Sequence, residues 1–341
     1  MSRHAGAARP ELSVVVPLYN EAPNVEQLHR ELTAALRAHG LSYELILVDD
    51  GSTDGTFAAL TALHAGDPHV CLVRLRRNFG QTAAFAAGFD QARGRIIVTL
   101  DGDLQNDPRD IPRLLARLAD GAEENDIVCG WRRDRRDPWL TRRVPSYFAN
   151  WLISATTGVK LHDYGCSLKA FRAEVVKPLR LYGELHRFIP AIASEQGVRI
   201  AEIVVNHRER RFGSSKYGLS RTVRVIFDLV TVKFLLSYST RPLQMFGPLG
   251  LLLGAGGVAI TGYLGYVRLV GGQSIGGRPL LVLGMLMMFL GVQLVTLGLL
   301  AELQARTFHE SQGKPIYAIR ELLESRLPGD GGPPSRLPPS G

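Results

Sequence analysis

Residues 95–105 have the sequence RIIVTLDGDLQ. Their β-branched run, entered from Gly94, predicts a buried strand, and the glycine between two acids predicts an exposed turn at its end. Asp101 and Asp103 therefore stand at the carboxyl end of this strand. Two carboxylates suit Mg²⁺ or Mn²⁺, which take one or two protein carboxylates and complete their shell with water and phosphate. An isolated Asp-x-Asp is more often a solvated turn, so the rest of the chain decides between the two interpretations.

Strands and helices alternate on both sides of this stretch, which predicts an α/β fold with a mostly parallel sheet covered on both faces. Pro17 is expected to end the first strand because proline cannot donate to a ladder. Ligands of such sheets bind beyond the carboxyl ends of the strands. The turns at residues 17–21, 49–54 and 101–105 are therefore expected to converge on one crevice. The predicted strands are 12–17, 43–48, 71–75, 95–99, 126–130 and 201–206, and the predicted helices are 24–38, from Thr56, 80–92 and 110–119.

Composition excludes several classes of protein. The 341 residues carry 40 basic and 32 acidic side chains, a net charge of +8 that suits phosphorylated substrates or an anionic membrane face. Nothing in the sequence matches a nucleic-acid-binding motif. Cys71, Cys129 and Cys166 are far apart, which favours a reducing compartment and argues against zinc. The absence of G-x-G-x-x-G after a strand and of a P-loop argues against a dinucleotide dehydrogenase or a P-loop ATPase.

Two stretches without charge predict transmembrane helices at residues 242–267 and 279–301, because each exceeds the roughly 20 apolar residues that a span needs. Basic residues are more numerous before the first predicted transmembrane helix and after the second than in the loop between them. This predicts that the N-terminal domain and both termini are cytoplasmic. Aromatic and amphipathic segments at 145–157 and 220–240 predict interfacial helices. The first ten residues lack the apolar segment of a signal peptide and are expected to be flexible. Residues 302–341 are expected to be a cytoplasmic tail with a disordered end.

Residues 210–216 add a phosphate-binding signal, because a Gly-Ser-Ser turn flanked by Arg210 and Lys216 can close over phosphates. With this loop, five motifs occur in order, and together they resemble the family 2 glycosyltransferases of GT-A fold. Within that family they are most similar to the dolichyl- or polyprenyl-phosphate sugar transferases. The resemblance covers residues 11–305, with the GT-A domain at 11–219. The motifs are VVPLYNE at 15–21, DDGSTD at 49–54, NFGQ at 78–81, DGDLQ at 101–105 and RRFGSSK at 210–216.

The resemblance implies a role for each matching residue. An acidic side chain suits the nucleoside site because it accepts hydrogen bonds from base N–H groups or ribose hydroxyls. The implied contacts to the base and ribose of the donor are Pro17, Tyr19, Glu21, Val48 and Asp50. The implied metal and diphosphate turn is Asp101, Gly102, Asp103 and Gln105, with Mg²⁺ or Mn²⁺ held by Asp101, Asp103 and Gln105, and Arg210 and Lys216 are implied to bind the diphosphate. The implied contacts to the acceptor phosphate are Arg132, Arg142 and Ser146.

The implied reaction is inverting transfer of a hexose from GDP-mannose or UDP-glucose to undecaprenyl or dolichyl phosphate, at the cytoplasmic face of the plasma membrane. A lipid monophosphate has a second pKa of about 6 and is already largely ionised at neutral pH, so no general base is obligatory. Asp163 matches an acidic position near the sugar, and we interpret it as an orienting contact rather than a base. The resemblance favours a homo-oligomer, such as a tetramer, and so do the small residues on the faces of the predicted transmembrane helices.

Two alternatives remain open at this stage. Residues 163–166 resemble transferases of modified sugars such as aminoarabinose, whereas residues 186–190 are more similar to the glucosyl and mannosyl enzymes. The first alternative is therefore an enzyme that transfers a modified sugar. The second is a membrane-anchored sensor that binds a nucleotide sugar without catalysis. It predicts that Asp103→Ala leaves function intact, whereas an enzyme would lose nearly all activity.

Overall fold

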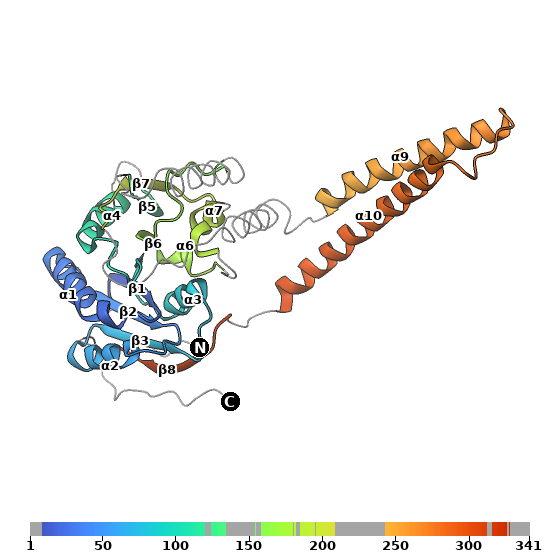
Figure 1. The fold of residues 1–341 in the computed structure, drawn as a ribbon. Coiled ribbons are helices and arrows are strands. Elements are labelled where there is room, and N and C mark those ends of the chain that lie inside the picture. Colours follow the sequence, from blue (N-terminus) through green and yellow to red (C-terminus); the bar gives the residue numbers. More distant parts are fainter. Residues whose placement is uncertain are drawn as a thin grey trace. The chain divides into compact units, whose positions relative to one another are not determined.

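The computed structural model describes residues 9–119, 124–133, 154, 158–179, 181, 185–194, 196–208, 243–311, 316–325 and 327. The chain divides into two compact units, residues 1–228 with 315–341 and residues 229–314. The first contains a sheet with its helices, and the second contains two long helices (Figure 1). The predicted interfacial segments at 145–157 and 220–240 lie outside the described residues, Ser154 excepted, as does the end of the tail from Pro328.

The first unit is built on an eight-stranded mixed sheet in the order β7-β5-β6-β4-β1-β2-β3-β8. β1 pairs in parallel with both β2 and β4, and β2 pairs in parallel with β3. β6 runs antiparallel to β4 and β5, while β7 is parallel to β5. The predicted parallel sheet is thus confirmed for its first four strands. The strands are β1 (Leu12–Leu18), β2 (Tyr43–Asp49), β3 (Val70–Leu75), β4 (Ile96–Thr99), β5 (Ile127–Trp131), β6 (Lys169–Arg172), β7 (Ile200–Val204) and β8 (Ile319–Leu323).

Alternation along β1 separates the two faces of the sheet. Val14 and Val16 share a buried cluster with Leu28 and Leu32 of α1. Val15 faces α3, where a Cβ on Gly88 would lie 2.2 Å from Val15 Cγ1, so only glycine allows this approach. Both faces are therefore covered, as predicted. The helices of this unit are α1 (Ala22–His39), α2 (Thr56–Gly66), α3 (Gln81–Gln91), η1 (Pro108–Asp110), α4 (Ile111–Leu118), α6 (Ala173–Val176), η3 (Leu185–Phe188) and α7 (Ile189–Ser194).

The prediction that Pro17 ends the first strand is wrong by one residue. β1 continues to Leu18, and Pro17 stands opposite Val48 of β2. The carbonyl of Val15 accepts from the N–H of Leu100, the residue that follows β4. The backbone N of Pro17, two residues later in the same strand, therefore also points toward β4. Because β1 pairs with β4 only as far as Val15, the missing N–H of Pro17 costs no ladder hydrogen bond.

β8 comes from the segment that the sequence predicted to be only a tail, and that prediction is wrong for residues 319–323. β8 follows the two long helices in the chain and pairs antiparallel with β3. Tyr317 Oη donates to Asp90 at 2.5 Å, and Arg93 donates to Ser325 Oγ at the same distance. The C-terminal segment therefore closes the free edge of β3, where exposed backbone groups invite aggregation.

We predict that Leu322→Ala, in β8, lowers the free energy of unfolding by about 2 kcal/mol or more, because it leaves a cavity against β3. Leu322 is 6% exposed. The matched control Arg320→Ala changes an exposed side chain of the same strand and is expected to stay within about 0.5 kcal/mol. Denaturant unfolding of the full chain measures both. Equal stability of the two variants would show that β8 is not part of the core.

The second unit consists of α9 (Leu243–Leu269) and α10 (Pro279–Ser311). Their segments Phe246–Leu269 and Pro279–Leu300 are long and apolar enough to cross a membrane. Buried core helices of soluble proteins also meet that test, but only 17% and 11% of the most apolar 18-residue stretches of these two segments are buried. Large apolar side chains such as Leu252 are exposed. The helices predicted at 242–267 and 279–301 are therefore present, and they support association with a membrane.

Glycines set how closely α9 and α10 pack. A Cβ on Gly257 would lie 2.6 Å from the carbonyl oxygen of Gly284, and one on Gly291 would lie 2.6 Å from that of Gly250. The pairs repeat at seven-residue spacing along both helices, which places small residues along one seam. Such seams let membrane helices approach until their backbones touch.

We predict that Gly291→Ala destabilises the pair of helices, because the added methyl group must push Gly250 away. Gly262→Ala on α9 is the matched control, since a Cβ there meets nothing within 4 Å. The loss is measured as a lower thermal midpoint of the detergent-solubilised chain. An identical midpoint for both variants would contradict this packing.

Candidate active site

The three predicted turns converge at the carboxyl ends of β1, β2 and β4. Asp50 N donates to the carbonyl of Leu18 at 2.9 Å, which joins the ends of β2 and β1. A Cβ on Gly102 would lie 3.1 Å from the side chain of Leu18 and 3.2 Å from the carbonyl oxygen of Pro17. The Asp-Gly-Asp turn therefore packs directly on the end of β1. This confirms the convergence expected from parallel strands.

The turns after β1 and β2 are joined by hydrogen bonds from backbone N–H groups to side chains. Thr53 N donates to Asn20 Oδ1 at 2.8 Å, and Asn20 N donates to Ser52 Oγ at 3.0 Å. Glu21 N donates to Thr56 Oγ1 at 2.9 Å. Asn20 adopts a left-handed φ of 56°, a conformation that asparagine tolerates better than most residues. The acidic turn 49–54 is thereby fixed against the start of α1.

Asp50 has a structural role that its sequence motif does not indicate. Its two carboxylate oxygens accept from Phe79 N at 2.8 Å and from Gly80 N at 2.9 Å. Burial raises the pKa of Asp50, and these two hydrogen bonds offset only part of that rise. Asp50 therefore holds the residues that lead into α3. Its expected contact with the donor stays a prediction.

Asp101 and Asp103 belong to a turn with a strained backbone and two carboxylates that repel each other. Gln81 Nε2 donates to Asp101 Oδ1 at 2.6 Å, and Gln105 N donates to Asp103 Oδ1 at 3.1 Å. Between Asp103 and Gln105, Leu104 has a φ of 61°, which is uncommon for a bulky residue. Burial raises the pKa of Asp101, and the adjacent Asp103 carboxylate raises it further. A cation between the two carboxylates would relieve that repulsion.

The donor atoms of this turn fit a hard divalent cation. Within the part of the chain that the structure describes, no three His, Cys, Asp or Glu side chains gather closely enough to hold a metal ion. A site with two carboxylates and an amide oxygen must therefore complete its shell with water or substrate oxygens. Mg²⁺ and Mn²⁺ accept that arrangement, whereas structural zinc does not.

Asp163 is buried and fully engaged by Arg132. Arg132 Nε donates to Asp163 Oδ2 at 2.8 Å, and Nη2 donates to Oδ1 at 3.0 Å. Burial alone would lower the pKa of Arg132, but the Asp163 carboxylate reverses this and raises it. Glu202 accepts from the backbone N–H groups of His162 and Asp163, so β7 supports the same turn. A carboxylate held by a two-point ion pair is suited to orienting other groups.

Four further residues support this site without having been singled out for a role from the sequence. Ser167 hydrogen-bonds Asp101, and its Oγ also accepts from Asn106 Nδ2 at 2.8 Å. The ammonium of Lys169 is buried and donates to backbone carbonyls of residues 164 and 166. Only Gln81 lies in a motif noted earlier. The four residues are Gln81, Ser167, Lys169 and Glu202.

The structure gives the burial of some of the remaining predicted site residues, and the others lie outside the described part of the chain. Tyr19, Glu21 and Gln105 are half-buried at the convergent edge. Val48 is 0% exposed within β2, so its side chain packs the end of the strand and its contact with the donor stays a prediction. The contact of Arg132 with the acceptor phosphate also stays a prediction. Arg142, Ser146, Arg210 and Lys216 lie outside the described residues.

Comparison with known proteins decides the family. Residues 13–180 match the family described as Glycosyl transferase family 2. The dodecaprenyl-phosphate galacturonate synthase of Rhizobium johnstonii is 48% identical over 322 residues, which cover 93% of this chain and 94% of that one. The chain belongs to glycosyltransferase family 2. It is therefore an enzyme of the glycosyltransferase class, as predicted.

Solved structures of a glycosyltransferase show the same fold. They include complexes of glucosyl-3-phosphoglycerate synthase from Mycobacterium tuberculosis. The complex with Mn²⁺, UDP and glucosyl-3-phosphoglycerate has a TM-score of 0.51 at 20% identity, over 66% of this chain and 79% of that chain. The complex with Mn²⁺, UDP and phosphoglyceric acid has a TM-score of 0.52 at 21% identity, over 66% and 78%. The first unit of this glycosyltransferase thus has the predicted GT-A fold.

We predict that Arg132→Ala lowers the free energy of unfolding by about 3 kcal/mol or more, because it leaves the Asp163 carboxylate buried without its partner. The double variant Arg132→Ala with Asp163→Asn is expected to recover part of the loss, since it removes the unpaired charge. Denaturant unfolding measures both variants. A double variant no more stable than Arg132→Ala would contradict the role of the ion pair.

Proposed function

We propose that this protein transfers a sugar from a nucleotide sugar to a polyprenyl phosphate at a membrane surface. The observation that carries the proposal is the 48% identity to a dodecaprenyl-phosphate galacturonate synthase over almost the whole of both chains. The two apolar helices support it, because a polyprenyl phosphate presents its head group at the bilayer surface. Cytoplasmic placement of the catalytic unit, at the inner membrane, is part of the proposal and rests on the flanking basic residues.

Galacturonate is the sugar that the relative favours. The hexose donors expected from the sequence, GDP-mannose and UDP-glucose, remain the second candidates, supported by the resemblance of residues 186–190 to glucosyl and mannosyl enzymes. Transfer of an aminoarabinose-type sugar is the third, supported by residues 163–166. All three use the same leaving group, a nucleoside diphosphate, and the same acceptor phosphate.

Within this proposal, Asp101, Asp103 and Gln105 hold a divalent cation and the donor diphosphate. When bound, the cation offsets the negative charge that develops on the leaving diphosphate. Mn²⁺ accompanies UDP in the complexes of the mycobacterial synthase, which supports use of a divalent ion. Arg210 and Lys216 are proposed to contact the same diphosphate as a fork and a point charge.

The acceptor needs little help from an acid or base. Its phosphate is largely ionised at neutral pH and attacks the anomeric carbon directly, in one displacement with inversion. The two-point ion pair with Arg132 supports an orienting role for Asp163 and not proton abstraction. Contacts to the acceptor phosphate are proposed for Arg132, Arg142 and Ser146. Contacts to the nucleoside are proposed for Pro17, Tyr19, Glu21, Val48 and Asp50.

A donor screen tests the proposal. Full-length protein in vesicles with polyprenyl phosphate is incubated with labelled UDP-galacturonate, UDP-glucose, GDP-mannose or a UDP-aminoarabinose derivative, and the lipid is extracted. Labelled lipid is expected with one donor, and UDP-galacturonate is the first candidate. No labelled lipid with any donor would overturn the proposal.

Removal of the metal tests the role of the Asp-Gly-Asp turn. We predict that excess chelator abolishes transfer and that added Mg²⁺ or Mn²⁺ restores it. Asp103→Asn is expected to lower kcat by about a hundredfold or more while the chain stays folded, since several kcal/mol of charge stabilisation are lost. Full transfer activity of this variant would contradict a role of Asp103 in holding the cation.

A further inference from the structure

The first turn of α3 begins at the edge where the three predicted turns converge. Just before the helix, the backbone N–H groups of Phe79 and Gly80 donate to the carboxylate of Asp50. Gln81 is the first residue of α3, and its side-chain amide donates to Asp101 Oδ1 at 2.6 Å. The start of α3 is thus tied both to the turn after β2 and to the Asp-Gly-Asp turn.

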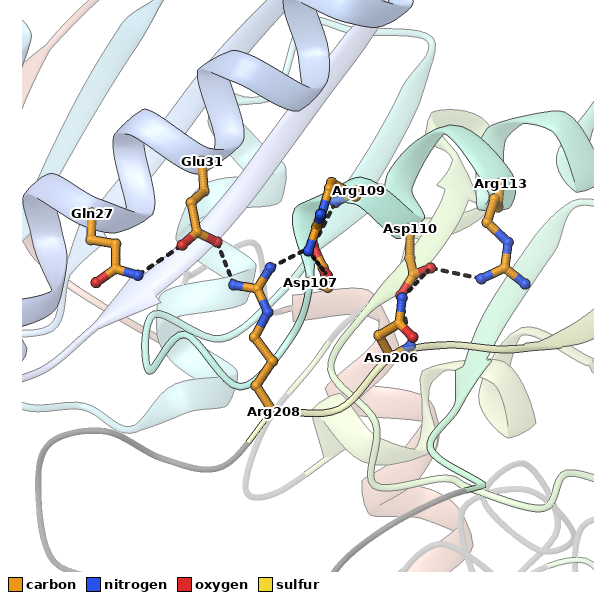
Figure 2. Close-up of polar contacts among 8 residues, drawn as sticks. All are labelled: Gln27, Glu31, Asp107, Arg109, Asp110, Arg113, Asn206 and Arg208. Carbon is orange, nitrogen blue, oxygen red and sulfur yellow. Dashed lines mark hydrogen bonds and ion pairs between the residues drawn. The ribbon is translucent and has the colours of Figure 1, made fainter.

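Neutral groups hold Asp101: the amide of the first helical residue and the hydroxyl of Ser167. Acids nearby in the fold have a cationic partner instead, because the guanidinium of Arg208 bridges Asp107 and Glu31 (Figure 2). A cationic side chain bonded to Asp101 would compete with a divalent ion for the same oxygens. An amide fixes the direction of the carboxylate and leaves its charge available to a metal.

The same turn of α3 is also bonded to His186 of η3. Thr82 is the second residue of α3, and its Oγ1 lies 2.7 Å from His186 Nδ1, with both residues buried. Arg187 Nε donates to His186 Nε2 at 3.4 Å. Because arginine only donates, Nε2 is the acceptor nitrogen, and the neutral ring donates its Nδ1 proton to Thr82. The hydroxyl of Thr82 therefore anchors the helix to η3.

Ring contacts anchor the rest of this helix in the same orientation. The ring centroids of Phe85 and His186 are 6.0 Å apart, and those of Phe89 and Phe171 of β6 are 6.3 Å apart. Thr82, Phe85 and Phe89 are spaced by three and four residues, so they lie on one face of α3. That face is therefore held against η3 and β6, and the helix cannot turn about its axis without losing these contacts.

Gln81 and Thr82 are neighbours in this turn, and successive side chains of a helix point about 100° apart. Holding Thr82 against η3 therefore also fixes the direction of Gln81. We propose that Gln81 is a positioning residue for the cation-binding turn, and that His186 holds Gln81 on Asp101 through Thr82. This inference rests on the proposed function, in which Asp101 binds a divalent cation. It gives His186 a role that is independent of which sugar is transferred.

The direct test is binding of Mn²⁺ to the full-length protein in detergent with UDP or, separately, GDP, followed by the electron paramagnetic resonance signal of free Mn²⁺. Gln81→Met removes the amide and is expected to raise the Kd for Mn²⁺ by about tenfold, a loss typical of removing a group that orients a metal ligand. Thr82→Val removes the acceptor hydroxyl and is expected to raise this Kd at least about threefold, above the usual scatter between independent sites. Thr82→Ser keeps the hydroxyl and is expected to match the wild type.

His64 supplies a matched control for His186. Each histidine is 8% exposed, and Nδ1 of His64 lies 2.8 Å from the carbonyl oxygen of Val70. Val70 begins β3, so this bond lies at the edge of the sheet opposite the carboxyl ends of the parallel strands. His186→Ala and His64→Ala are both expected to lower the thermal midpoint, but only His186→Ala is expected to weaken Mn²⁺ binding. The two Thr82 variants carry the test should His186→Ala fail to fold.

A double-mutant cycle shows whether the effect of Thr82 passes through Gln81. Thr82→Val is expected to add little to the Kd of Gln81→Met, because the amide being positioned is already absent. In the transfer assay, each single variant is expected to need more Mg²⁺ for half-maximal rate, while its kcat at saturating Mg²⁺ changes little. A loss of folded protein alone would not separate these two quantities.

Four outcomes would overturn the inference. The first is a Kd for Mn²⁺ that is unchanged in Gln81→Met or Thr82→Val, or a wild type that binds no Mn²⁺ with either nucleotide. The second is an equal loss of affinity in His64→Ala, the third is an equal loss in Thr82→Ser and Thr82→Val, and the fourth is a full additional loss when Thr82→Val is combined with Gln81→Met. Failure of the proposed function is distinct, because it appears as a wild type that binds Mn²⁺ with a nucleotide but labels no lipid with any donor.

Discussion

The parallel pairing of β1 with both β2 and β4 is the constraint on which the site depends. Parallel neighbours end at the same edge of a sheet, so the three turns that follow them must meet. The register decides how closely they meet, because Pro17 stands opposite Val48 and β4 ends opposite Val15. The Asp-Gly-Asp turn then folds over the end of β1, where a Cβ on Gly102 would lie 3.1 Å from the side chain of Leu18.

Several acidic side chains lie near the carboxyl ends of these strands, and their interaction partners differ. Asp50 is held by backbone N–H groups, and Asp163 is held by the guanidinium of Arg132. Asp101 and Asp103 repel each other. The pair that repels is the one suited to a divalent cation, whereas Asp50 and Asp163 hold the chain around it. In the proposed reaction, negative charge is offset where the diphosphate leaves, and the ion pairs and hydrogen bonds of the other acids keep the surrounding site rigid.

The catalytic unit is not a continuous piece of chain. β8 follows the two apolar helices in sequence and yet completes the sheet beside β3. Its short strand carries Arg320 and Glu321, and the interactions that hold it come from Asp90, Arg93 and the edge of β3. The two apolar helices are therefore an insertion in the chain of this unit, before its last strand.

The sequence by itself determined the parallel half of the sheet, the two apolar helices and the Asp-Gly-Asp turn. Each of these is a local pattern: a β-branched run, an uncharged stretch longer than a bilayer, or a glycine between two acids. The predicted end of the first strand at Pro17 was wrong by one residue. The strand can continue through Pro17 because its neighbour β4 stops pairing two residues earlier, at Val15. The family motifs also identified Asp101, Asp103 and Asp163 as candidate site residues.

Only the tertiary structure decided which partner each charged group has. The pairing of Arg132 with Asp163, of Gln81 with Asp101, and of Arg208 with Glu31 and Asp107 joins residues 20 to 177 positions apart. It also decided that β6 is antiparallel and that β8 belongs to the sheet. Such pairings depend on how the strands are ordered in space, and no periodicity of a single segment encodes that order.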